Sequence, residues 1–512
     1  MKFTRFHFLS SMAGMAAAAL LPRRAAAAAP AGSAPATPSN PVQAENALPG
    51  ASDWQLTRVR LDSGGFRSPW IEGYCSKQSL KAGESLDIMV SANPAILFEV
   101  EIFRMGYYDG KGARLMTKLG PFDGITQPDP EKGEKNLHEC RWTPSASLTI
   151  PEDWLSGVYL GRLTTLPGSD ALPYWQSYVI FVVTDERPAD ILFQVSDNTW
   201  QAYNRWPNNY SVYTHPDGGQ GPWADVSFDR PYGFEAQNTS VVYDPLTVGS
   251  GEFLPFEFPL AYWLEKEGYD VTYCANIDMV TPDHGLKCKS FISVGHDEDW
   301  DIRQFNSVMK MRDEGVNLLF LSGNSVCWVT PFRDSADGRP NRIIFRGGPY
   351  GAENYYATGR QRDHGPFPEH GPDEGLLMGA RNVEPVNGGG DWIIEKPEHW
   401  IFEGTGVKKG DRIPGLIGWE YHGMPADIPG LEIVAGGKAF VGGDTPQDWT
   451  ATIYPGPKDN FVFNASTIFW SQALSSPPGH TLPWSHWSRP HGPDERVQRI
   501  MENLLRRAIK GD

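Results

Sequence analysis

The sequence has little positive charge and only one long apolar stretch. Its 512 residues contain 45 Lys and Arg against 62 Asp and Glu, which gives a formal net charge of −17. A surplus of negative charge disfavours binding to nucleic acid and to anionic membranes. The long apolar stretch lies at residues 6–21 and is interrupted by polar residues, so we expect no stable membrane insertion.

Cysteine is also scarce, with five residues in a chain that we expect to meet an oxidising compartment. Cys75 could pair with Cys140, and Cys274 could pair with Cys288, but the sequence alone leaves the pairing open. The remaining Cys327 could be a nucleophile. Because no matching acid–base pair accompanies it, we favour a buried structural thiol.

The N-terminal residues have the layout of an export signal. Two basic residues precede the apolar stretch, and an alanine-rich tract follows it. Residues 4–9 resemble a twin-arginine signal in which Phe6 replaces the second arginine. We therefore expect an exported protein, periplasmic or secreted, with a signal at residues 1–31 and a disordered linker at residues 32–51.

Two patterns divide the rest of the chain, and no internal repeat is found. Short alternating strands separated by turns predict an antiparallel, Ig-like β-sandwich at residues 52–187. From residue 188 strands and helices alternate, so residues 188–512 are predicted to form an α/β catalytic domain with a mostly parallel sheet. Three consecutive glycines at 388–390 lack the strand and helix of a phosphate loop, which argues against nucleotide binding.

The chemistry is expected where three predicted strands end in polar residues. Residues 291–295 are apolar and too short for a core helix, so they predict a buried parallel strand that ends before His296 and Glu298. The next predicted strand runs into Asn324, and an upstream strand runs into residues 197–206. Ligands of such sheets bind at the carboxyl ends of the strands, so these three segments can share one crevice.

Each of these residues also has a purely structural interpretation. Carboxylates at a helix N-terminus favour the helix dipole. This accounts for the aspartates after the strand but not for His296, so we favour a site role for His296 and Glu298. Tyr203 and Tyr213 could be amphipathic aromatic residues at a rim, and Asn324 could be a turn residue.

Seven motifs spread over almost the whole mature chain carry a resemblance to a known family. They lie at residues 103–108, 154–160, 200–206, 211–218, 295–298, 322–328 and 462–466. Together they resemble the large (β) subunit of N,N-dimethylformamidase and its relatives. The resemblance implies a β-sandwich followed by a catalytic domain with a class I glutamine-amidotransferase-like fold.

The resemblance also implies a mononuclear iron held by two tyrosines and a glutamate. Carried over by motif, the metal ligands are Tyr203, Tyr213 and Glu298, with His296 and Asn324 beside them as catalytic residues. Phenolate and carboxylate are hard anionic donors, which suit a ferric ion acting as a Lewis acid.

Two tyrosines remain alternatives for the second phenolate. The interval between the two carried-over tyrosines is shorter than the family pattern leads us to expect, so Tyr210 or Tyr243 could replace Tyr213.

We therefore expect a metal-dependent hydrolase that cleaves a C–N amide bond of a small-molecule substrate. The ferric ion would polarise the carbonyl group, His296 would move a proton and Asn324 would stabilise the oxyanion. The alternative is a non-enzymatic exported protein whose aromatic cleft binds a ligand such as a glycan. The sequence leaves open the substrate, a homo-oligomer and the role of the sandwich.

Overall fold

The computed structural model describes residues 39–60, 66–168, 173–213, 224–233, 244–351, 370–382, 388–440, 446–483 and 490–511. The predicted export signal lies outside these residues. Part of the predicted linker is helical, because helix α1 spans Pro41–Asn46. The Asn40 side chain caps this helix by accepting a hydrogen bond from the N–H of Gln43, and proline suits the first helical turn.

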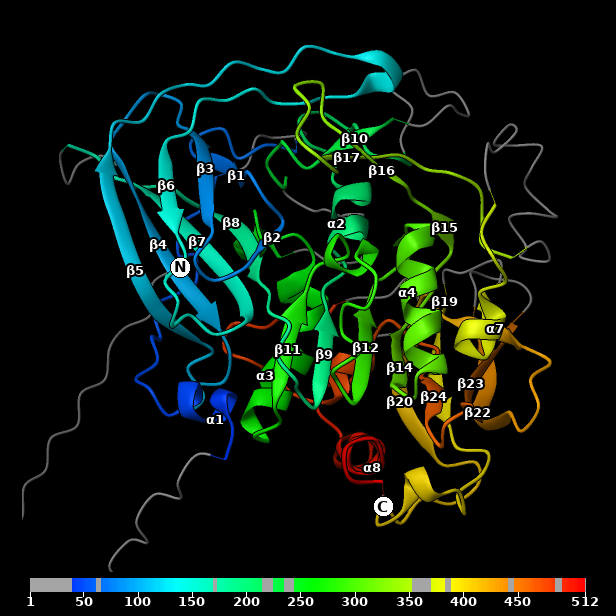
Figure 1. Cartoon of the computed structure of the whole chain (residues 1–512). Coiled ribbons are helices and arrows are strands. Elements are labelled where there is room, and N and C mark those ends of the chain that lie inside the picture. The colour runs from blue at the N-terminus through cyan, green and yellow to red at the C-terminus, as the bar shows by residue number, and fades with distance from the viewer. Residues whose placement is uncertain are drawn as a thin grey trace, which may run out of the picture. The chain divides into compact units, whose positions relative to one another are not determined.

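Two β-sheets form the first part of the described chain, and their strands are blue and cyan in Figure 1. The strands are β1 (Glu72–Cys75), β2 (Ser79–Leu80), β3 (Ser85–Ser91), β4 (Phe98–Met105), β5 (Ala113–Phe122), β6 (Ala146–Thr149), β7 (Gly157–Thr165) and β8 (Gln176–Val183). The strand orders are β1-β3-β6 and β2-β8-β7-β4-β5. Strand β2 pairs with β8 in parallel, whereas the other pairs are antiparallel. Side chains of both sheets share one apolar core, which includes Ile88, Val100 and Phe181.

A seven-stranded mixed sheet follows, with the order β11-β9-β12-β14-β24-β23-β22. Its strands are β9 (Ile191–Gln194), β11 (Val271–Cys274), β12 (Ser290–Gly295), β14 (Asn317–Ser322), β22 (Glu432–Ala439), β23 (Gln447–Pro455) and β24 (Phe461–Asn464). The first five strands in this order run parallel, and β23 is antiparallel to both of its neighbours. The parallel strands therefore end at a common edge.

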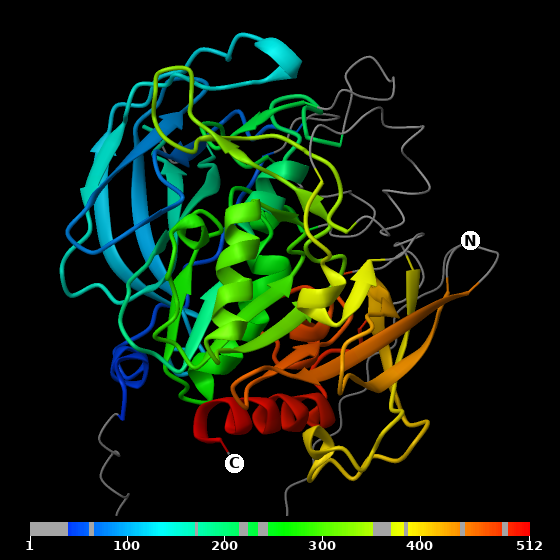
Figure 2. The ribbon, with the colours of Figure 1, turned by 45° about the vertical axis from the view of Figure 1, so that its right-hand side comes forward.

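Helices cover the parallel strands on both faces. Helix α4 (Ile302–Asp313) packs Phe305 and Val308 into a core with Phe291 and Phe320. Helices α3 (Phe258–Lys266) and α8 (Glu495–Lys510) share a different core with the alternate side chains of the same strands, among them Ile292. Figure 2 shows α8 in red and α4 in green. No helix in the described part of the chain is both long and apolar enough to cross a membrane.

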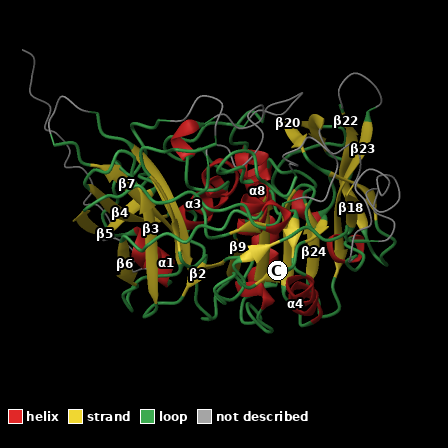
Figure 3. Ribbon diagram, turned by 90° about the horizontal axis from the view of Figure 1, so that it is seen from above, coloured by secondary structure: helices red, strands yellow, loops and turns green. Residues whose placement is uncertain are grey.

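The predicted fold class is wrong, because the structure is mostly β with mixed sheets and does not support a glutamine-amidotransferase-like α/β domain (Figure 3). After β14 the chain forms short strands and irregular segments before β24. The remaining strands of the described residues form small sheets, and two of these strands, β10 and β13, come before β14. The pairs are β10 (Val226–Ser227) with β17 (Ile343–Ile344) and β16 (Phe332–Arg333), β13 (Asp299–Trp300) with β15 (Trp328–Val329), β18 (Ala380–Asn382) with β21 (His422–Pro425), and β19 (Gly388–Ile393) with β20 (Arg412–Trp419). Helix α7 (Gly375–Met378) lies among them. The prediction extended a local strand–helix alternation to a segment whose glycines and prolines favour turns instead.

A buried ion pair joins the first sheets to helix α3. Arg104 of β4 donates to both carboxylate oxygens of Glu265, at 2.9 and 3.0 Å, and both side chains are 0% exposed. Tyr273 and Asn46 donate to the same carboxylate at 2.9 and 2.7 Å. A buried ion pair is stable only when its desolvation is offset by such additional hydrogen bonds. This network therefore couples the stability of the first sheets to that of the mixed sheet.

All five cysteines are free and buried. The suggested pairs, Cys75 with Cys140 and Cys274 with Cys288, are therefore not formed. Cys327 is a buried thiol, and burial together with nearby carboxylates raises its pKa well above the usual range. A thiol in this state is a poor nucleophile.

Candidate metal centre

Strand β12 ends at a glycine that turns the chain sharply toward the site. Gly295 has a φ of 71°, and a Cβ there would lie 3.0 Å from the Cβ of Phe256. The turn leaves His296 and Glu298 at the carboxyl end of the strand, where they are only 1% and 2% exposed. Since β9 and β14 flank β12, the segments after all three strands meet at this edge, as the sequence predicts.

Glu298 is the residue on which the predicted site side chains converge. Its Oε2 accepts a hydrogen bond from the Tyr203 hydroxyl at 2.6 Å, and its Oε1 accepts one from the Asn324 Nδ2 at 3.1 Å. The Nε2 of His296 lies 3.1 Å from Glu298 Oε2. Tyr203 is the last residue of helix α2 (Asp197–Tyr203), which follows β9. The structure thus brings together four of the five predicted site residues.

Tyr213, the fifth predicted residue, lies beside this group. Its ring stacks on Tyr203 with the centroids 4.2 Å apart, while its hydroxyl donates to Asp299 Oδ2 at 3.2 Å. The alternative Tyr210 stacks instead on a histidine of the first part of the chain. The other alternative, Tyr243, lies outside the described residues. Tyr213 is therefore better placed than Tyr210 to supply a second phenol.

Two glutamates that the sequence analysis did not select surround His296. Glu420 Oε2 lies 2.8 Å from the Nε2 of His296, and Glu252 Oε2 lies 3.4 Å from its Nδ1. The ligand atoms of His296, Glu298 and Glu420 all lie within 4.8 Å of one another, a grouping that could hold a metal ion. Glu420 had a usable signal, since it directly follows strand β20. Glu252 had no comparable signal.

Several buried acidic side chains lie close together at the site. Burial and a neighbouring carboxylate raise the pKa of Tyr203 and of Tyr213 well above the usual range of a phenol. Burial also raises the pKa of Asp299 to about 8 and that of Glu420 to about 7. Burial by itself would lower the pKa of the His296 imidazole. The surrounding glutamates have the larger effect and raise this pKa well above its usual range. Such a collection of acids strongly favours a nearby cation.

A second glycine allows Glu420 to approach the end of β14. A Cβ on Gly323 would lie only 2.2 Å from the carbonyl oxygen of Glu420. The next residue, Asn324, has a φ of 51°, a region that asparagine tolerates better than most residues. Its Oδ1 is buried and makes no hydrogen bond within the part of the chain that the structure describes. Backbone strain of this kind is typical of functional sites.

The family described as N,N-dimethylformamidase beta subunit-like, C-terminal, matches residues 99–483. The chain belongs to this family.

The matched residues of this dimethylformamidase beta subunit-like chain include every candidate site residue. They begin in β4 and end beyond β24, so the match covers most of the first sheets as well as the mixed sheet. Membership in the family indicates a hydrolase.

Comparisons with curated proteins and with solved structures give no further indication of the function of this dimethylformamidase-like chain. A search of curated proteins finds no match. Among solved structures, a family 123 glycoside hydrolase from Clostridium perfringens is 10% identical, with a TM-score of 0.11 over 54% of this chain and 51% of that chain. The chain thus spans about half the length of that hydrolase, and the TM-score is too low to indicate a shared fold.

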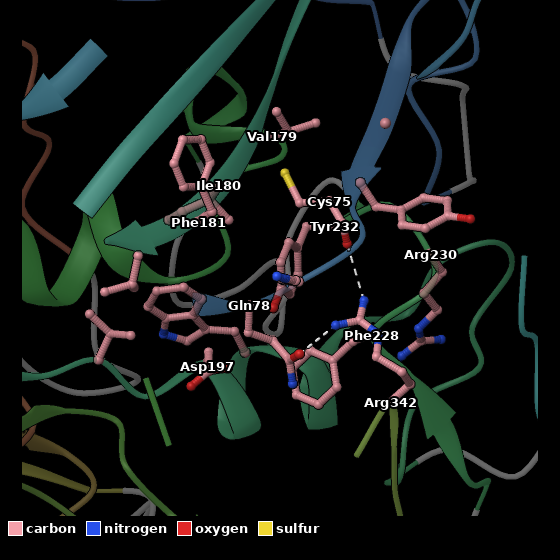
Figure 4. Close-up of a pocket in the computed structure, with 16 residues that line it drawn as sticks. Cys75, Gln78, Val179, Ile180, Phe181, Asp197, Phe228, Arg230, Tyr232 and Arg342 are labelled. Atoms are coloured by element: carbon pink, nitrogen blue, oxygen red, sulfur yellow. Dashed lines mark hydrogen bonds between the residues drawn. The ribbon is translucent and has the colours of Figure 1, made fainter. Parts of the chain in front are cut away.

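A pocket of about 440 Å³, partly open to solvent, lies between β1, β8 and the start of α2 in this dimethylformamidase-like chain (Figure 4). None of the five predicted site residues lines it. Its two arginines already have structural partners. Arg342 donates to the carbonyl oxygen of Cys75 and to Gln78, and Arg230 donates to the carbonyl oxygens of Trp206 and Tyr210. The predicted site residues therefore lie outside this pocket.

Proposed function

We propose that the chain is an amide hydrolase that uses one ferric ion held by Tyr203, Tyr213 and Glu298. The observation that carries the proposal is the 2.6 Å contact between the Tyr203 hydroxyl and Glu298 at the buried edge of the parallel strands. Membership in the dimethylformamidase beta subunit-like family supports the hydrolase class. The proposed substrate class follows from the name of the family, which points to small amides.

The donor set fits a hard cation. Phenolate and carboxylate oxygens are the ligands that Fe(III) prefers. Glu252, Glu298, Asp299 and Glu420 are all at most 3% exposed, so water screens their negative charge poorly and a bound cation would favour their ionised forms. His296 offsets part of this charge, and a trivalent ion would offset more. The two stacked phenols can supply further anionic oxygens when such an ion binds.

A second donor set, formed by His296, Glu298 and Glu420, shares one carboxylate with the first. We favour the tyrosine set because both ring nitrogens of His296 face carboxylates, Glu252 at Nδ1 and Glu298 and Glu420 at Nε2. An imidazole enclosed in this way suits the transfer of protons better than the donation of a lone pair to a metal.

The residues around Glu298 can divide the chemistry of amide hydrolysis among them. A ferric ion bound here would supply Lewis acidity, which polarises a carbonyl group and acidifies a water molecule. His296 can hold a proton at Nε2 and give it to the leaving amine, with Glu420 at 2.8 Å as its proton partner. Asn324 donates one N–H of its amide to Glu298 and has a second N–H for the substrate carbonyl oxygen.

Metal content and amine release test this proposal together. Untagged wild-type protein should contain about one iron per chain and should release amine from members of a panel of formamides and acetamides. If the protein binds iron but cleaves no amide of the panel, the proposed metal site would stand and the assignment of amides as substrates would be wrong. Protein that binds no iron under any loading condition would remove the mechanism, and binding of zinc alone would also count against it.

A further inference from the structure

Helix α2 contacts the candidate metal centre at two points one helical turn apart. Tyr203 donates its phenol hydrogen to the Glu298 side chain. Thr199 accepts hydrogen bonds at its Oγ1 from the backbone N–H groups of Glu298, at 2.9 Å, and of Asp299, at 3.1 Å. Asn198 donates to the carbonyl oxygen of Asp299 at 3.2 Å. The helix therefore holds both the backbone and the side chain of the same segment.

We propose that Thr199 is a positioning residue that sets the separation between the Tyr203 phenol and the Glu298 carboxylate. This inference rests on the proposed function, in which both groups bind the metal. A threonine hydroxyl has two acceptor lone pairs, and Thr199 uses both of them on the Glu298 segment. The contacts close a ring from Thr199 through the Glu298 backbone and side chain to Tyr203 and back along one turn of α2.

The segment that carries Glu298 is held from two sides. Its carbonyl oxygens accept hydrogen bonds from the backbone N–H groups of residues 326–328, and the N–H groups of Glu298 and Asp299 donate to Thr199. The segment follows the turn at Gly295, and the strand after it, β13, has only two residues.

Thr199 is 0% exposed and belongs to a helix whose own start is anchored. There, Asp197 Oδ1 accepts a hydrogen bond from the N–H of Asn276 at 2.7 Å, and the Asn276 Oδ1 accepts one from the N–H of Asn198 at 2.9 Å. The anchored helix therefore fixes the position of the Glu298 backbone through Thr199.

Three variants separate positioning from general stability. Thr199→Val keeps the shape of the side chain and removes the acceptor, whereas Thr199→Ser keeps the acceptor and removes a methyl group. Thr165→Val is the matched control, because Thr165 is also buried and its Oγ1 accepts the N–H of Trp175 at 2.7 Å in the first sheets. For each variant we would determine the metal-free structure, the iron affinity by competition with a chelator, and the melting temperature.

Thr199→Val should separate the Tyr203 hydroxyl from Glu298 and lower the iron affinity about 10- to 100-fold, the usual effect of losing a residue that orients a ligand. Thr199→Ser should restore both the contact and the affinity. Thr165→Val should lower the melting temperature and leave the iron affinity unchanged.

Three outcomes would overturn the positioning role. These are an unchanged contact and affinity in Thr199→Val, an affinity not restored by Thr199→Ser, or an equal loss of affinity in Thr165→Val. If the wild type binds no iron but Thr199→Val still loses the contact while Thr199→Ser keeps it, the positioning role is supported and the proposed metal chemistry alone fails.

Discussion

The Tyr203 hydroxyl donates a 2.6 Å hydrogen bond to the Oε2 of Glu298, although the two residues lie far apart in the sequence. Tyr203 ends the helix that follows β9, and Glu298 follows β12. Since β9 and β12 are adjacent and parallel, their ends lie side by side. A carboxylate and a phenol held together in a buried site can both become hard anionic ligands of a metal ion once the phenol loses its proton.

Tyr203→Phe should weaken and shift the visible phenolate-to-Fe(III) absorption of the iron-loaded protein, because only the Tyr213 phenolate remains. Iron affinity should fall by at least about 100-fold, since the loss of a residue that merely orients a ligand already costs about 10- to 100-fold. The phenylalanine ring preserves the stacking on Tyr213, so the fold should persist. Absorption spectra and iron content would be compared with those of Tyr262→Phe, whose ring packs on Tyr107 in another part of the chain. Full iron content and an unchanged spectrum in Tyr203→Phe would argue against the phenolate ligand.

Glu298→Gln and Glu420→Gln should behave differently. The first removes a proposed ligand and should lose iron and activity together. The second removes the proton partner of His296 and should keep iron while turnover falls by about 10-fold or more. Asp301→Asn, which alters the N-cap of α4, should change neither. Loss of iron in Glu420→Gln, with iron retained in Tyr203→Phe, would favour the donor set of His296, Glu298 and Glu420.

His296→Ala should retain most of the iron and lose about 10²- to 10⁴-fold in turnover, because its proposed role is proton transfer. Its two ring nitrogens contact glutamates on both sides, so the variant also removes the cation that lies among them. Steady-state kinetics and metal analysis of the same preparation would separate the two effects. Retained turnover in the alanine variant would show that another group carries the proton.

Glu265→Gln should destabilise the protein by about 3–5 kcal/mol, because it leaves the charge of Arg104 buried without its partner. The matched control is Glu502→Gln, which breaks the half-exposed pair with Arg499 on α8 and should cost about 0–1 kcal/mol. Urea unfolding monitored by fluorescence measures both. A cost below about 1 kcal/mol in Glu265→Gln would mean that the first sheets do not depend on this link.

Asp197→Asn should make the protein more resistant to unfolding above pH 4. Burial raises the pKa of Asp197 to about 8 from an ordinary value of 3.8, so the folded protein keeps a proton that the unfolded chain releases. The wild-type free energy of unfolding should therefore fall as the pH rises from about 4 to about 8, by roughly 1.4 kcal/mol per pH unit from this group. The variant keeps an Oδ1 that can accept the N–H of Asn276 and has no proton to lose.

Urea unfolding at several pH values would measure this difference. The advantage of Asp197→Asn over the wild type should grow with pH and level off above about pH 8. Thr165→Val, which changes no ionisable group, should leave the pH dependence unchanged. A constant difference between Asp197→Asn and the wild type across the whole range would show that Asp197 ionises normally in the folded protein.

Local pattern in the sequence determined most individual elements. Helix α8 spans Glu495–Lys510, where apolar side chains recur on one face between the N-cap Asp494 and a left-handed Gly511. The predicted strand at 291–295 also agrees with β12, since a short apolar run stops at a glycine. These features depend only on side chains that are close together along the chain.

The proximity of three predicted site residues could be anticipated for the same reason. Glu298, His296 and Asn324 each follow a strand directly, so adjacency of two parallel strands is enough to bring them together. The choice of Tyr203 and Tyr213 came from resemblance to a family, since residue type alone favoured ordinary rim aromatics.

Only the tertiary structure decided the fold class and the surroundings of His296. The pairing of β24 with β14, and the antiparallel β23 and β22 beyond it, join segments separated by a long irregular stretch. The same stretch carries Glu420, which reaches His296 because Gly323 leaves room for its backbone. A local pattern records which face of a segment is apolar, but not which distant segment packs against it. That choice depends on the steric fit of whole elements in three dimensions.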